Sequence, residues 1–142
     1  MTELDRALVR RKLTAISRNL ADLEPIAGLS LQEYMSDRLR RKAVERLLQE
    51  VVDAAVDVNL HMLRTLDVEL PGDYYTSFIG MGRHGVLTLE LAERLAPAAG
   101  LRNRLVHEYD DIDDAIVLSA VRVATQDLGE FVTAIDGYLR QE

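Results

Sequence analysis

Residues 44–66 read VERLLQEVVDAAVDVNLHMLRTL, and this stretch decides the fold class of the chain. Its apolar residues recur every three or four positions, the spacing that places side chains on one face of an α-helix. They are Val44, Leu47, Leu48, Val51, Val52, Ala55, Val58, Met62 and Leu66. We expect a long helix from the start signal at Ser36-Asp37 to about Leu66, with a broad apolar face packed against other helices.

The flanking segments show the same helical period and no sustained alternation of the kind that strands have. A first helix is expected from about Leu4 to Leu23, ending near Glu24-Pro25 because proline disfavours helical geometry in the residue before it. Ser30 and Glu33 form a capping box for a short helix that ends at Met35.

Shorter helical pieces are expected in the second half, from Tyr75 to Met81 and from Thr88 to about Leu105, with two glycines interrupting the chain between them. Pro97 should kink or restart the second piece. A last long helix is expected from about Asp113 to Leu139. We therefore predict an all-α fold, an antiparallel bundle of four or five helices, in a single domain over residues 1–142.

Composition narrows the function. The chain has no cysteine, which excludes thiol nucleophiles, disulfides and thiolate metal sites. Charges interrupt every long apolar run and no signal peptide is recognised, so we expect a cytoplasmic protein without a membrane span. The net charge of -7 argues against a protein that coats nucleic acid indiscriminately.

Five basic residues lie close together in the sequence: Arg38, Arg40, Arg41, Lys42 and Arg46. We interpret them as a solvated helix face rather than as a binding patch.

A cation, an imidazole and a phenol lie within the eight residues from Arg102 to Tyr109. A guanidinium can bind a phosphate through two parallel hydrogen bonds, and an imidazole can move protons near neutral pH. Arg102 and His107 are five positions apart, about 140° around a regular helix. We therefore expect the helix to end or distort between them, with Tyr109 leaning into the same pocket. Read alone, His107 is more typical of a helix cap than of a catalyst.

A second polar set follows helical spacing on the long central helix: Asp53, Asp57, His61 and Arg64. The stripe is interpreted either as a solvated face or as one wall of a functional cleft, in which Asp53 and Asp57 would support the site. Asp57 and His61 alone do not make a metal site, because further ligands are needed. We therefore predict no metal and no cofactor.

The segment from Gly100 to Asp110 resembles the signature of the HEPN superfamily, an Arg followed after four to six residues by a His. Asn directly after the Arg and Tyr two residues after the His resemble the extended form found in HepT-type toxins. The similarity in order and spacing extends to residues 41–49, 57–61, 71–78 and 91–95, and covers about residues 4–139.

This resemblance implies a toxin ribonuclease that works without metal, as a homodimer whose two motifs line one cleft. Arg102 and His107 match the catalytic pair, and Asn103 matches the supporting position. Tyr109 matches the tyrosine that a partner, an MntA-type nucleotidyltransferase antitoxin, modifies with AMP. The substrate is RNA, either tRNA or mRNA.

The chemistry expected of such a site uses the 2'-hydroxyl of the RNA as nucleophile, with His107 moving the proton and Arg102 stabilising charge on the phosphoryl oxygens. The alternative is a non-catalytic module that docks to, or binds nucleotide for, a minimal nucleotidyltransferase. The presence of Arg102 and His107 beside a modifiable phenol favours the enzyme.

Overall fold

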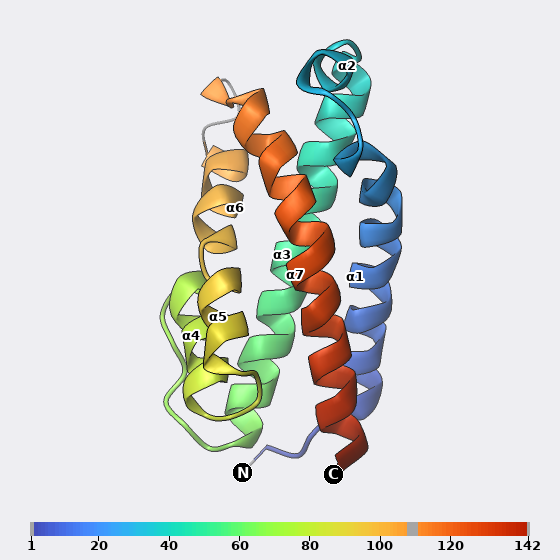
Figure 1. The fold of residues 1–142 in the computed structure, drawn as a ribbon. Coiled ribbons are helices and arrows are strands. Elements are labelled where there is room, and N and C mark those ends of the chain that lie inside the picture. The colour runs from blue at the N-terminus through green and yellow to red at the C-terminus, as the bar shows by residue number, and fades with distance from the viewer. Residues whose placement is uncertain (1, 108–110, 142) are drawn as a thin grey trace.

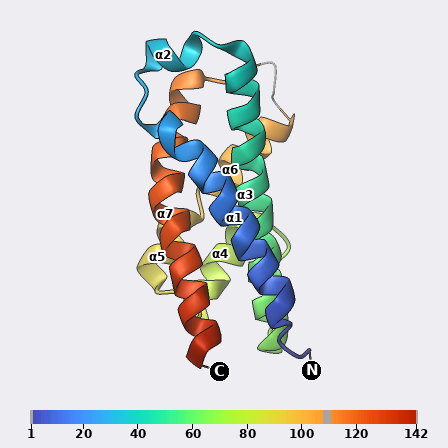
Figure 2. The same ribbon diagram turned by 90° about the vertical axis from the view of Figure 1, so that its right-hand side faces the viewer.

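The computed structural model describes residues 2–107 and 111–141, which form seven α-helices and no strand (Figure 1). The long helices are α1 (Arg6–Ala27), α3 (Arg38–Thr65) and α7 (Asp114–Gln141). The shorter helices are α2 (Leu31–Met35), α4 (Tyr74–Arg83), α5 (Leu89–Leu95) and α6 (Ala98–His107). The long helices lie side by side, while α5 and α6 follow one another along the bundle as a composite fourth helix (Figures 1 and 2). The predicted all-α bundle is confirmed.

Several predicted helix boundaries are set by side chains that cap the first turn. At α2 the capping box is complete: the Glu33 N–H donates to Ser30 Oγ at 3.1 Å, and the Ser30 N–H donates to Glu33 Oε1 at 2.9 Å. Asp37 caps α3 by accepting a hydrogen bond from the Arg40 N–H at 3.1 Å. Pro97 separates α5 from α6, so the predicted restart is confirmed.

The predicted end of α1 at Glu24-Pro25 is wrong, because Pro25 lies inside the helix, which continues to Ala27. Proline removes one backbone donor and crowds the carbonyl four residues before it, and α1 ends soon after Pro25, at Ala27. A distant residue then satisfies carbonyls at this end: Arg122 of α7 donates from Nε to the Ala27 carbonyl at 3.0 Å and from Nη2 to the Leu29 carbonyl at 2.7 Å.

The core forms around α3, which buries eleven of its 28 residues and contacts α1, α4, α6 and α7. Phe78 of α4 meets Phe131 of α7 edge to face, with ring centroids 6.3 Å apart, so the short helices are tied to the long ones by aromatic packing. Charged residues interrupt the long helices, and none of the helices described is both long and apolar enough to cross a bilayer.

The two glycines at the end of α4 have different roles. Gly82 lies inside the helix, where an added Cβ would be 2.7 Å from Ala92 Cβ and 3.2 Å from Leu89 Cα. Gly85 follows the helix with a φ of +78°, a left-handed conformation that favours glycine. Gly82 therefore permits the close approach of α4 and α5, and Gly85 permits the turn between them.

Gly82→Ala should lower the free energy of unfolding by about 1–3 kcal/mol, because the new methyl group overlaps Ala92 and the backbone of α5. Gly137→Ala in α7 is the matched control: no atom lies within 4 Å of its added Cβ, and Ala is the better helix former by up to about 1 kcal/mol. Denaturant unfolding of both variants measures the difference, and equal stabilities would contradict the close α4–α5 contact.

Candidate active site

The side chain of Arg102 points from α6 toward α3. Its Nε donates to Asp53 Oδ1 at 2.7 Å, and the two side chains form an ion pair in which they remain 20% and 33% exposed. Pairing offsets part of the cost of withdrawing both charges from water. The interaction therefore fixes α6 against α3 and fixes the edge of the guanidinium that carries Nε.

Tyr74, the first residue of α4, covers the same guanidinium. The Arg102 Cζ lies 4.9 Å from the centroid of the Tyr74 ring, a cation–π contact. Partial burial raises the pKa of the Tyr74 phenol, and the neighbouring Asp53 carboxylate raises it further. Three helices therefore meet around one cation: α3 through Asp53, α4 through Tyr74 and α6 through Arg102.

His107 and Asn103 lie on a different face of α6 from Arg102, and both are exposed. Contrary to expectation, the helix neither ends nor breaks between Arg102 and His107, since α6 runs from Ala98 to His107. Their spacing of five residues leaves them about 140° apart around the helix axis. Asn103 lies four residues before His107, so these two share a face. Within one chain, Arg102 and His107 therefore point in different directions.

The predicted polar stripe of α3 is divided among several partners. Asp53 contacts Arg102, whereas Asp57 pairs with Lys12 of α1 at 2.8 Å. His61 is buried, and its Nε2 accepts a hydrogen bond from the Asp5 N–H at 2.9 Å, while Arg64 is exposed. Only the first member of the stripe contacts the motif arginine. Tyr109 lies outside the residues that the structure describes.

The sequence leaves open whether the aromatic residues of α4 stack on bases or anchor the helix. In the structure the three aromatic residues have different environments: Phe78 is in the core, Tyr75 is 53% exposed, and Tyr74 contacts Arg102. Nothing in the sequence distinguishes Tyr74 from its neighbour Tyr75, because the distinction depends on which of the two faces α6.

Four of the five residues of the predicted basic cluster form hydrogen bonds or ion pairs with other residues of the chain. Arg40 donates to the Glu33 carbonyl, and Arg41 pairs with Asp114 at 2.9 Å. The next two pair along their own helix, Lys42 with Glu45 at 3.5 Å and Arg46 with Glu50 at 3.1 Å, while Arg38 is exposed. These contacts favour the interpretation of a helix face over that of a dedicated binding patch.

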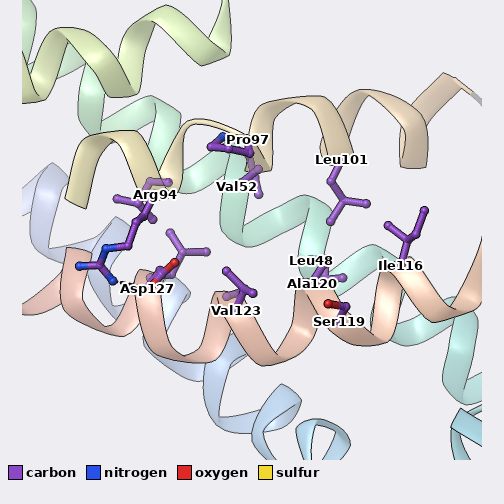
Figure 3. A pocket seen from close by; sticks show the side chains of 14 residues that line it. Leu48, Val52, Arg94, Pro97, Leu101, Ile116, Ser119, Ala120, Val123 and Asp127 are labelled. Atoms are coloured by element: carbon purple, nitrogen blue, oxygen red, sulfur yellow. Dashed lines mark hydrogen bonds and ion pairs between the residues drawn. The ribbon is translucent and has the colours of Figure 1, made fainter. Parts of the chain in front are cut away.

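An apolar groove of about 290 Å³ lies between α5 and α6 on one side and α7 on the other, and Leu48 and Val52 of α3 also line it (Figure 3). Arg94 and Asp127 pair at 2.7 Å at one end of the groove. Leu101 lines it, but neither Arg102 nor His107 does. The groove is therefore separate from the charged site. Within residues 2–107 and 111–141, no three His, Asp or Glu side chains are arranged to hold a metal ion.

Comparison with known proteins gives consistent matches. Residues 16–135 match the family described as Ribonuclease HepT-like. The chain is 40% identical to a tRNA nuclease HepT of Aphanizomenon flos-aquae, with 98% of this chain and 95% of the relative covered. It is 25% identical to an mRNA nuclease HepT of Shewanella oneidensis, with 90% and 96% covered.

Among solved structures, the fold is similar to that of the tri-AMPylated Shewanella oneidensis HEPN toxin in complex with MNT antitoxin. The TM-score is 0.83 at 23% identity, and the match covers 94% of this chain and 99% of that one. At this identity, the likeness establishes the shared helical fold.

Asp53→Asn should lower the free energy of unfolding by about 1–3 kcal/mol, because it removes the charged acceptor of a half-buried guanidinium. Asp57→Asn, one turn further along α3, should cost about 0.5 kcal/mol or less, since the carboxylate is 53% exposed and its partner lies at the surface. Denaturant unfolding of the two variants compares the pairs, and a larger loss for Asp57→Asn would contradict this account of the site.

Proposed function

This chain belongs to the HepT-like ribonuclease family, and we propose that it is the toxin of a toxin–antitoxin pair that cleaves RNA until a partner enzyme modifies it. The proposal is supported mainly by one combination: the chain is 40% identical to a protein named as a tRNA nuclease, and it has both Arg102 and His107 on α6. The substrate proposed first is tRNA, because the relative named as an mRNA nuclease is more distant.

The proposed reaction requires only the groups of this chain and the RNA. The 2'-oxygen attacks the adjacent phosphorus as His107 removes its proton, the bond from phosphorus to the 5'-oxygen breaks, and the departing oxygen takes up a proton. The products are a 2',3'-cyclic phosphate and a 5'-hydroxyl end. Arg102 stabilises the negative charge that builds up on the phosphoryl oxygens.

A second copy of the chain completes the proposed site. Arg102 and His107 of one chain diverge by about 140° on α6, so one chain does not direct both groups at one phosphate. In a two-fold dimer, the exposed His107 of one copy is free to approach the Arg102 region of the other. Such an arrangement would supply two imidazoles to one cleft, one to accept and one to donate a proton.

The proposed antitoxin is a minimal nucleotidyltransferase of the MntA type. Support comes from the sequence match of Tyr109 and from the name of the structural neighbour, an AMPylated toxin bound to an MNT antitoxin. An added AMP brings bulk and negative charge close to the site of phosphate binding. Like charges would then repel the RNA backbone.

His107→Ala should reduce the rate of tRNA cleavage by about 100- to 10,000-fold, which is the contribution of a positioned general acid or base. The melting temperature should not change, because His107 is exposed. The measurement incubates the purified protein with total tRNA and, separately, with an mRNA transcript. Gel analysis then gives the cleavage rate and the ends produced.

His84→Ala serves as the matched control for this experiment, because His84 is also an exposed residue at the end of a helix. It should cleave tRNA at the wild-type rate. If His107→Ala retained that rate as well, His107 would have no part in the chemistry.

Co-expression with a cognate nucleotidyltransferase and ATP should add the mass of AMP to the wild-type chain but not to Tyr109→Phe. The modified wild type should also lose RNA cleavage. Intact-mass spectrometry gives the first result, and Tyr75→Phe is the control, because it changes another tyrosine, which is exposed, and leaves Tyr109 intact. An equal mass gain in the wild type and Tyr109→Phe would remove Tyr109 from the scheme.

A further inference from the structure

The guanidinium of Arg102 is held at one edge and on one face only. Its Nε donates to Asp53, and the ring of Tyr74 lies against the planar group. Among the described residues 2–107 and 111–141, the two terminal nitrogens donate no hydrogen bond to the protein. The edge that carries them is the one suited to bind two oxygens of a phosphate in parallel.

Arg94 shows how a purely structural arginine differs. Its terminal Nη1 lies 2.7 Å from both Asp127 and Glu130, and Glu90 approaches its Nε at 3.9 Å. Three carboxylates surround that guanidinium, and two of them bind its terminal nitrogen Nη1. Arg102 has one carboxylate, placed at the opposite edge.

We propose that Tyr74 is a positioning residue of the ribonuclease site: its ring holds the Arg102 guanidinium in the plane set by Asp53, with both terminal nitrogens directed at one RNA phosphate. This inference rests on the proposed function and extends it to α4. The hydrogen bond to Asp53 alone leaves the guanidinium free to rotate about the Nε contact. The ring restricts that rotation, because a planar cation gains most when it stays over the aromatic face.

The position of Tyr74 supports this role. The ring is part of the first turn of α4, whose start is fixed by Asp73, which accepts a hydrogen bond from the Thr76 N–H at 2.7 Å. One turn later, Phe78 is fully buried and anchors the helix in the core. The ring is therefore attached to a rigid element, which is what precise placement of a catalytic group requires.

The test compares single-turnover and steady-state cleavage of tRNA by three variants. Tyr74→Leu removes the ring and should lower kcat by about 3- to 30-fold with little change in KM, because the misdirected guanidinium is missed most in the transition state. Tyr74→Phe keeps the ring and should stay within about threefold of the wild type. Tyr75→Leu, the exposed neighbour, should cleave at the wild-type rate.

A further arm tests whether Tyr74 acts through Arg102. In an Arg102→Ala background, Tyr74→Leu should cause no additional loss of the residual single-turnover rate. If Tyr74→Leu does not fold, as judged by its melting curve, Tyr74→Met preserves the apolar volume and takes its place.

The inference is overturned if Tyr74→Leu, or Tyr74→Met in its place, cleaves at the wild-type rate, or if Tyr74→Phe loses as much activity as the leucine variant. The inference is also overturned if Tyr74→Leu lowers the cleavage rate by the same factor in the Arg102→Ala background as in the wild type. A different result would contradict the proposed function: a wild-type protein that does not cleave RNA, or one whose cleavage is unchanged in His107→Ala. A wild type that cleaves RNA through His107 while Tyr74 proves dispensable would reject this inference alone.

Discussion

The packing of α3 against its neighbours is the interaction on which the rest of the molecule depends. The helix contacts α1, α4, α6 and α7, and it contributes eleven buried residues to the core. Asp53 lies at the border between the buried and the exposed residues of this helix and is one-third exposed beside α6. The packing of α3 therefore also determines where a half-buried arginine finds its partner.

The continuity of α6 is the second constraint. Leu105 is buried between Arg102 and His107, and Ala99 is buried one turn before Arg102. Unwinding the last turn to bring His107 around to the side of Arg102 would expose Leu105 and break backbone hydrogen bonds. A site shared between two copies avoids that cost, because each copy keeps its helix intact and offers a different face. The geometry of one helix therefore favours the homodimer that the proposed function requires.

The sequence predicts those features that depend on residues close together in the chain. The Ser30–Glu33 box, the Asp37 cap and the restart at Pro97 all act within one turn. The end of α1 is not predictable in this way, because the residue that satisfies its last carbonyls is Arg122, 95 positions after Ala27. The helical period likewise places the polar residues of α3 on one face, but not their partners, which come from α1 and α6. Of the pair Tyr74 and Tyr75, only tertiary packing selects the one that meets Arg102.

In the proposed scheme, the acidic balance of the chain explains how a single modification would control it. The chain carries a net charge of -7, and carboxylates already occupy Lys12, Arg41 and Arg94. If the chain cleaves RNA as proposed, binding would depend on few phosphate contacts, and the rate enhancement would come from well-placed groups rather than from general attraction to the RNA backbone. In the proposed scheme, the AMP phosphate competes with the substrate at one cation. An enzyme with a broad basic surface would retain its RNA despite one added negative charge, whereas a chain with an excess of acidic residues would offset that charge less well.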